Sequence, residues 1–235
     1  MPKKNILNTP KITIQKFINE SIVWKYYKIN PENNLIQYLR KTYGDLKTEL
    51  AKEVYTLGTS NDGGTIFWSI NTNSKVQKAK ITYYDSNGKR TDKFKVPYKN
   101  EDGYYSCLFG EHLIYDEMKG KKTIVLTESE KTAVIGFILF PQYVWLAYGG
   151  INGLTESKTT PLIGHNVLIV PDMSENAVGI ILNKIPFLIS LGINAKIWDL
   201  TEGKTDEKLK FEGIYNNDLE DIFRKINIKV NNLKY

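Results

Sequence analysis

The chain has 235 residues, 41% hydrophobic and 25% charged, which is enough to bury a core in one large domain or two small ones. Its 32 basic and 26 acidic residues give a net charge of 32 − 26 = +6, which is compatible with a polyanionic partner and does not require one. A single cysteine, Cys107, excludes an internal disulfide and a thiolate zinc site. The N-terminus lacks the apolar segment of a signal peptide, and no apolar run is long enough to span a membrane. We therefore expect a cytoplasmic protein.

The N-terminal part of the chain has a helical pattern. After a basic leader over residues 1–10, apolar side chains recur at three- and four-residue spacings between residues 12 and 55. The segment 30–34 interrupts this pattern, and Pro31 is suited to the first turn of the helix that follows. We predict two or three short helices that pack on the rest of the domain.

A three-stranded antiparallel meander is predicted over residues 65–98. The pattern changes after the glycine-rich turn at 59–64, and strands are expected at 65–70, 76–84 and 89–98. The sequence Asp85-Ser-Asn-Gly88 supplies the positive φ angles of a hairpin turn between the last two strands.

Basic and aromatic side chains alternate along this meander. Lys80, Lys89 and Arg90 are the basic residues that we select as candidate nucleic-acid contacts, because tyrosine and phenylalanine residues are interleaved with them. The alternative interpretation is a solvated basic face whose aromatic residues point into the core. The sequence leaves both interpretations open.

Glu111 and His112 suggest a metal or acid–base site. Their side chains are adjacent in sequence and diverge on a helix, and the only other histidine is His165. We therefore expect a structural role for both. A basic turn at 119–122 ends this half, and we predict two domains, 1–120 and 121–235.

The second half alternates between strands and helices, which predicts an α/β fold with a parallel sheet and right-handed crossovers. A polar loop is expected over 201–213, followed by an acidic helical segment from Asn217 and a frayed tail. The predicted strands are 123–127, 143–148, 166–171 and 195–199, and the predicted helices are 129–140, 152–160 and 175–191.

Two acidic residues follow strands of this predicted sheet. Glu128 comes after the first strand and Asp172 after the third. The ends of parallel strands share one edge, so these carboxylates are expected on the order of 5–10 Å apart, suited to a divalent cation. The alternative is that each carboxylate only caps the helix after it.

The order of these motifs resembles the Toprim domain, which bacterial primases, topoisomerases and certain nucleases share. Glu128 takes the place of the glutamate of the first motif, and the segment 128–133 (Glu-Ser-Glu-Lys-Thr-Ala) is similar to the variant of phage and plasmid primase-helicases. Gly149-Gly150 follows the second strand. The second motif, Asp-x-Asp, is similar to Asp172-Met-Ser174, in which serine replaces the second aspartate.

The resemblance implies a role for several residues. Glu128 would be a metal ligand or general base, Asp172 a ligand of Mg²⁺ or Mn²⁺, and Lys131 a contact to a phosphate near a helix N-terminus. Glu175 is expected to replace part of the lost aspartate as a metal ligand. Asp218 and Asp221 are similar to the acidic residues that follow some Toprim cores, but we expect them at surface helix positions; Asp199 ends a strand and has the same two interpretations.

The segment before the Toprim-like part is similar to the corresponding part of bacterial primases. Strands and a hairpin precede Leu108-Phe-Gly110, in the order and spacing found there. The resemblance implies a primase-like protein of a mobile element, without a zinc ribbon, that acts on a single-stranded DNA or RNA template, uses nucleotides and works with a helicase or mobilisation partner. Two alternatives are a DNA-binding accessory protein on a degenerate Toprim scaffold and, third, a Toprim nuclease.

Overall fold

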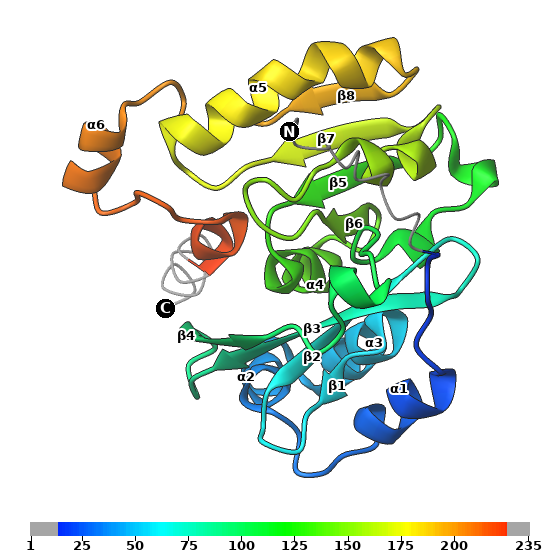
Figure 1. The fold of residues 1–235 in the computed structure, drawn as a ribbon. Coiled ribbons are helices and arrows are strands. Elements are labelled where there is room, and N and C mark those ends of the chain that lie inside the picture. Colours follow the sequence, from blue (N-terminus) through cyan, green and yellow to red (C-terminus); the bar gives the residue numbers. More distant parts are fainter. Residues whose placement is uncertain (1–13, 225–235) are drawn as a thin grey trace, which may run out of the picture.

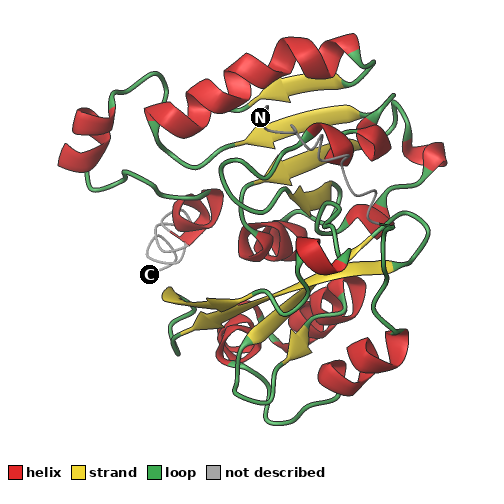
Figure 2. Ribbon diagram, in the orientation of Figure 1, coloured by secondary structure: helices red, strands yellow, loops and turns green. Residues whose placement is uncertain are grey.

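The computed structural model describes residues 14–224, and the predicted leader and the end of the predicted tail lie outside this range. The chain forms an antiparallel sheet and a parallel sheet (Figures 1 and 2). The helices are α1 (Glu20–Tyr27), α2 (Asn34–Tyr43), α3 (Asp45–Tyr55), α4 (Glu130–Leu139), α5 (Glu175–Ser190) and α6 (Asp206–Phe211). The strands are β1 (Gly58–Thr59), β2 (Thr65–Ile70), β3 (Val76–Tyr84), β4 (Arg90–Lys95), β5 (Thr123–Thr127), β6 (Val144–Ala147), β7 (Asn166–Val170) and β8 (Asn194–Ile197).

The antiparallel sheet is the predicted meander, with the short strand β1 added at one edge. Its order is β1-β2-β3-β4, and the β3–β4 pairing places Tyr84 opposite Arg90. Side chains alternate between the two faces of β2. Phe67 and the opposite Lys80 point to the parallel-sheet half, whereas Trp68 packs with α1 and its surroundings.

The parallel sheet has the order β6-β5-β7-β8, which confirms the predicted α/β class with a parallel sheet flanked by helices. Its central strands are short runs of buried β-branched and aliphatic residues, as expected for a sheet covered on both faces. The residues of β5 divide between two cores: Val125 packs on the α4 side, and Ile124 and Leu126 pack on the α5 side.

Local signals set most helix boundaries. Ser129 and Ser174 cap α4 and α5, each accepting a hydrogen bond from an N–H of the first turn. Asn33 caps α2, so Pro31 lies before the helix rather than in its first turn, contrary to our expectation. The N-terminal part forms three helices, where two or three were predicted.

Two predictions for the second half are wrong. The expected helix at 152–160 consists of two short 3-10 turns, Glu156–Lys158 and Thr160–Leu162. The expected loop at 201–213 contains α6, which Thr205 caps and whose Leu209 is fully buried. In the described part of the chain, no helix combines the length and the apolar character needed to cross a bilayer.

The two halves share a core. Phe109 forms an isolated bridge to Ala147 at the edge of β6, and the Tyr55 hydroxyl donates to the Trp145 carbonyl over 2.8 Å. The largest hydrophobic cluster contains Leu35 from α2, Val134 from α4 and other residues from both halves. The division at residues 120/121 remains a prediction.

Candidate metal centre

Glu128 and Asp172 lie at the same edge of the parallel sheet. β5 and β7 are neighbours, and their register pairs Thr127 with Val170, so the two acids leave adjacent strands just after their last paired residues. Neighbouring strands are about 4.8 Å apart, which places the two carboxylates on one side of a narrow edge.

The glycine pair after β6 fixes the backbone at Glu128. The N–H groups of Gly149 and Gly150 both donate to the Glu128 carbonyl, over 3.0 and 3.1 Å. Both glycines have positive φ angles, +83° and +103°, which side chains with a Cβ rarely adopt. The glycine pair that the sequence showed after the second strand therefore serves the geometry of the acidic edge.

A third segment brings two more carboxylates to this edge. The Met173 N–H donates to the Asn217 carbonyl, and the Asn216 N–H donates to the Met173 carbonyl, each over 2.9 Å. This pairing places Asp218 beside Asp172. Asp218 and Asp221 then bond each other's backbone N–H over 3.1 Å, a reciprocal cap for the helical residues 219–224.

Asp218 is also held from α4, because the Thr132 hydroxyl donates to its carboxylate over 2.6 Å. We call Glu128, Asp172, Asp218 and Asp221 the acidic cluster. Sequence analysis left Asp218 and Asp221 among surface helix positions, and the structure corrects this: both are only partly exposed and face Asp172. The Asp-x-x-Asp capping spacing was the available signal.

The charges of the acidic cluster repel one another. Burial, followed by the charges of Glu128, Asp218 and Asp221, raises the pKa of Asp172 to about 8. Burial also raises the pKa of Glu128, with Lys80 and Arg90 opposing the change. Burial and Asp218 raise the pKa of Asp221.

Such a set fits a hard divalent cation. Several carboxylate oxygens at one partly buried point are suitable ligands for Mg²⁺ or Mn²⁺, and a bound cation would relieve their mutual repulsion. Asp218, Glu220 and Asp221 can place one ligand atom each within 4.8 Å of one another.

Glu220 has a different environment from its neighbours. Its side chain is fully buried and accepts from the ammonium of Lys131 over 2.6 Å and from the Arg224 guanidinium. The Arg224 side chain also lies over the ring of Tyr38. We call Glu220, Lys131 and Arg224 the ion-pair network. Lys131, expected to contact a phosphate, is here engaged in this network.

Glu175 does not join the acidic cluster, contrary to the prediction. Its carboxylate accepts from the Asp206 N–H over 2.9 Å, and the Asp206 carboxylate accepts from the Glu175 N–H over 2.8 Å. This exchange ties α5 to α6. Ser174 caps α5 and so does not replace the missing aspartate, while Asp199 bonds Thr201 within its own turn.

Glu111 and His112 have structural roles, as predicted. Glu111 is buried and accepts from the Leu108 N–H over 3.1 Å. The Nε2 atom of His112 lies 2.9 Å from the Val54 carbonyl, and burial lowers the pKa of its ring.

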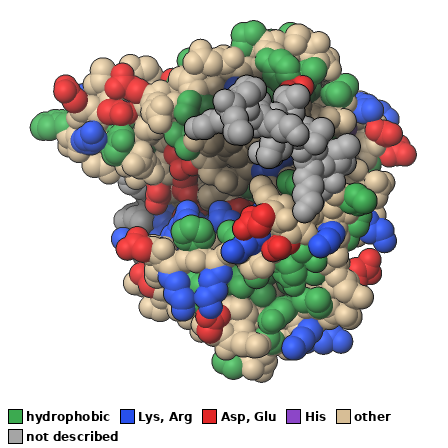
Figure 3. Space-filling view, viewed as in Figure 1, with side chains coloured by type: hydrophobic (Ala, Val, Ile, Leu, Met, Phe, Trp, Pro, Cys, Tyr) green, Lys and Arg blue, Asp and Glu red, His purple; other side chains and the backbone are tan. Residues whose placement is uncertain are grey.

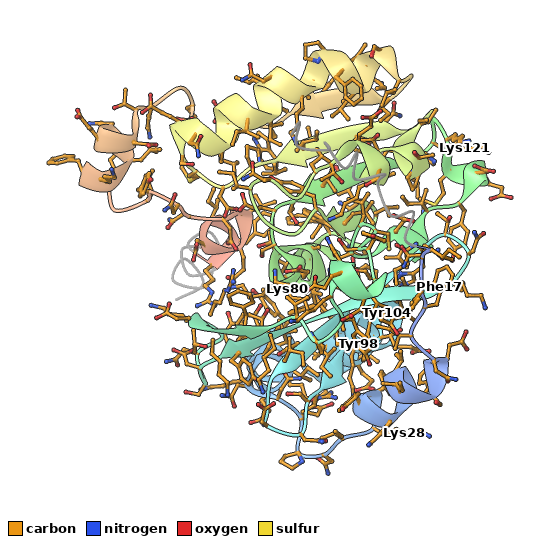
Figure 4. The ribbon with its side chains drawn as sticks, in the orientation of Figure 1. Phe17, Lys28, Lys80, Tyr98, Tyr104 and Lys121 are labelled. Carbon is orange, nitrogen blue, oxygen red and sulfur yellow. The ribbon has the colours of Figure 1, made fainter. Side chains whose placement is uncertain are left out.

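The predicted nucleic-acid contacts lie on β3, on β4 and in the turn between them, and Figure 3 shows acidic and basic side chains gathered around a recess at the left of the molecule. Lys80 lies between β3 and α4 and pairs with Glu130 over 2.8 Å (Figure 4). Lys89 and Arg90 are exposed, and Arg90 is close enough to influence Glu128.

The aromatic residues of the meander divide between the two interpretations. Tyr83 and Tyr84 are buried, as in a solvated face with an aromatic core, whereas Phe94 on the edge strand β4 is 56% exposed.

One family model matches the chain: it covers residues 33–173 and is described as “Domain of unknown function (DUF6371)”. A comparison with curated protein sequences gives no match.

Several solved structures are similar. A DnaG catalytic core is 12% identical with a TM-score of 0.59, and the match covers 88% of this chain and 77% of that one. The RNA polymerase domain of Mycobacterium tuberculosis primase DnaG is 10% identical with a TM-score of 0.57, over 84% and 81%. A DnaG primase catalytic domain bound to ssDNA is 10% identical with a TM-score of 0.56, over 83% and 73%.

The chain spans 55% of the Aquifex aeolicus primase, whose structure holds zinc binding and RNA polymerase domains, at 18% identity and a TM-score of 0.48. At the identities of the three structures above, the likeness shows the fold: this chain has the fold of a primase catalytic core.

Proposed function

Because the chain belongs to the DUF6371 family, whose description names no activity, we propose its function from the acidic cluster: metal-dependent, primase-like transfer of nucleotides on a nucleic-acid template. The observation that carries the proposal is the gathering of four carboxylates at one edge of the parallel sheet, where burial and then the charges of the other three raise the pKa of Asp172 to about 8. Carboxylates that serve only as caps do not need to meet at one point.

Under this proposal Glu128 and Asp172 hold Mg²⁺ or Mn²⁺, and Asp218 completes the ligand set. A cation there would neutralise charge on a transferring phosphoryl group and orient the attacking oxygen. The residues themselves keep the site in shape: Thr132 fixes the Asp218 carboxylate, and the two glycines fix the Glu128 backbone. Alternatively, Glu128 would act as the general base and accept a proton from an attacking hydroxyl.

The template would bind on the opposite wall of the recess. Lys89 and Arg90 are exposed there, and the edge strand β4 adds the exposed ring of Phe94, which pairs with Thr82 and so lies on the same face as Lys80. Exposed cations with an exposed aromatic ring suit a single strand, since the cations contact phosphates and the ring can stack on a base. The DnaG domain bound to ssDNA shares this fold and supports the choice of a single-stranded partner.

A second candidate function is nucleic-acid binding without catalysis. The observation in its favour is Ser174, which caps α5 where the Toprim pattern has its second aspartate. Lys131 also faces the buried Glu220 rather than the open edge. A scaffold of this kind would act as an accessory protein in replication or mobilisation and would bind DNA equally well with a chelator present. A nuclease would use the same acidic cluster and would shorten the template instead of extending a product on it.

Nucleotide incorporation on a single-stranded template separates these functions. We expect incorporation with Mg²⁺ or Mn²⁺ that falls on the order of 100-fold in Glu128→Gln and Asp172→Asn, because each variant removes a ligand charge. Asp199→Asn is the matched control, since Asp199 also follows a strand but bonds only within its own turn. Full activity in both site variants rules out the enzymatic proposal.

Binding measurements complete the test. In the accessory-protein proposal, all variants lack incorporation, and DNA binding is salt-sensitive and independent of chelator. No binding to DNA or RNA at low salt would exclude that proposal. The mobile-element setting and a helicase partner follow from the sequence resemblance and are part of the proposal.

A further inference from the structure

A second polar site lies beside the acidic cluster, between the two sheets. It is a cavity of about 170 Å³, formed where β3 of the antiparallel sheet faces the end of β6. Its charged lining residues are Lys78, Lys80, Lys158 and Glu130, so the lining carries 3 − 1 = +2 charges. Two hydroxyls, from Ser69 and Ser106, also line it.

Lys158 is one of the cations of this cavity that have no carboxylate partner. It belongs to the 3-10 turn Glu156–Lys158, and its ammonium donates to the Tyr148 carbonyl over 3.0 Å. An ammonium has three donors, and one acceptor does not satisfy them. Among residues 14–224, no carboxylate oxygen lies within 4.0 Å of the Lys158 ammonium. Burial lowers its pKa, which shows that the site holds a cation at a cost.

The two lysines of β3 complete a cationic pocket. Lys78 and Lys80 are two residues apart and therefore point to the same face of the strand. The ammonium of Lys80 is shared with Glu130, while that of Lys78 contacts the side-chain oxygen of Asn100. Three ammonium groups around one small cavity form a site for a compact, multiply charged anion.

The cavity is close enough to the acidic cluster for their charges to interact. Tyr148 lines it, and after burial the charges of Glu128 and Asp172 are what raise the pKa of the Tyr148 hydroxyl. Lys80 lines it as well and acts on Glu128 from the other side. A group bound in the cavity would therefore lie next to anything held by the acidic cluster.

We propose that this cavity binds a phosphate chain, with Lys158 as its central contact together with Lys78 and Lys80. The volume of about 170 Å³ suits a di- or triphosphate. Only the identity of the ligand rests on the proposed function. If that function holds, the bound phosphate chain is the terminal part of the incoming nucleotide or the pyrophosphate that leaves. The site then separates the phosphates at β3 from the template at β4.

Calorimetric titration with inorganic tripolyphosphate, at low salt and with EDTA present, tests the site without a metal or a nucleotide. We expect binding by the wild-type chain and a loss of affinity of about tenfold or more in Lys158→Met, because a charge-assisted contact in a buried site is removed. Lys158→Arg retains the positive charge and should recover part of the affinity.

Lys184→Met is the matched control. Lys184 is also half-buried and donates to a backbone carbonyl, that of Leu154, but it does not line the cavity. We expect its affinity to stay within about twofold of wild type. Equal losses in both variants would reduce the effect to net charge and overturn the proposal, as would unchanged affinity in Lys158→Met or no binding by the wild-type chain. Thermal unfolding of each variant checks that it is folded.

A metal titration on the same variants separates this inference from the proposed function. Lys158→Met should bind Mn²⁺ as the wild type does, because Lys158 is not a ligand. Binding of tripolyphosphate without any metal binding would leave the phosphate site standing and remove the proposed function. Metal-dependent incorporation with no tripolyphosphate binding would remove the phosphate site alone.

Discussion

The short helical segment after Asp218 contributes acids to two environments that differ in charge balance. The charges of Asp218 and Asp221 act on Asp172 together with that of Glu128, and little positive charge compensates them. Glu220, between them in sequence, has a carboxylate oxygen within 4.8 Å of theirs, but its carboxylate is bonded by the cations of Lys131 and Arg224. One turn of helix thus separates a crowded set of anions from a neutralised one.

This difference shows how a structural acid can be told from a site. Glu220 is more deeply buried than Asp172, yet its charge is matched by two cations, as the stability of a buried ion requires. Asp172 has no such match, and its carboxyl keeps a proton up to about pH 8. Burial alone does not mark function; burial without compensation does.

Removing the shared carboxylate of the ion-pair network should have the largest effect on stability. In Glu220→Gln, the cations of Lys131 and Arg224 lose their shared carboxylate. We expect a loss of about 3 kcal/mol in the free energy of unfolding and a Tm lower by about 6–12 °C. Glu202→Gln is the control: the Glu202 side chain is 80% exposed, and its change should stay within about 0.5 kcal/mol. A Tm of Glu220→Gln equal to that of the control would contradict the comparison.

In the acidic cluster, the loss of one carboxylate charge is expected to raise stability. The folded-state pKa of Asp172 is about 8, against an ordinary value of 3.8. The contribution of this carboxyl to the free energy of unfolding is therefore fully present below about pH 4 and is lost as the pH rises through 8. Asp172→Asn removes the charge that costs stability. Without metal, we expect Tm to rise by about 4–8 °C at pH 8, for roughly 2 kcal/mol, and to stay the same at pH 4.

Differential scanning calorimetry of both proteins across this pH range measures the effect. The difference between them should grow between pH 4 and pH 8. Two curves of Tm against pH that run parallel over the whole range would show that the pKa of Asp172 is not raised. The crowding of the acidic cluster would then lose its main support.

The sequence predicts one half of the acidic cluster and not the other. Glu128 and Asp172 follow β-branched runs, and the common direction of parallel strands places the ends of such runs at one edge. Asp218 reaches this edge through backbone bonds between Met173 and Asn217, residues 44 positions apart, and no local pattern specifies that contact. Glu175 fails for the same reason: Asp206, far along the chain, holds its carboxylate away.

The errors in the fold have a related cause. α6 is rich in lysine and glutamate and buries one apolar side chain, Leu209, so its six residues show no apolar period. The stretch 152–160 contains Gly153 and forms tight 3-10 turns instead of a helix. Long elements with a buried face, such as the three strands of the meander, are predicted because their pattern repeats.

Binding of a divalent cation should offset the repulsion between the carboxylates of the acidic cluster and so raise stability. At pH 7.5, Mg²⁺ or Mn²⁺ at about ten times its dissociation constant should stabilise the wild type by about 1.4 kcal/mol, which is about 3–5 °C in Tm. Asp172→Asn should respond much less, whereas Asp199→Asn should respond like the wild type. An equal response in all three proteins would place the cation elsewhere.

The smallest expected effect concerns the basic wall of the recess. Lys89→Met and Arg90→Met should each weaken binding to a single strand a few-fold at low salt and reduce the slope of log affinity against log salt by about 0.7, because each exposed cation releases counterions from one phosphate. Lys122→Met, at the opposite end of β5, removes the same charge far from the recess. Fluorescence anisotropy with a labelled oligonucleotide over a salt series gives both quantities. If Lys122→Met lowers the slope as much as the other two variants, the chain binds through its net charge, and the basic wall has no special part in holding the template.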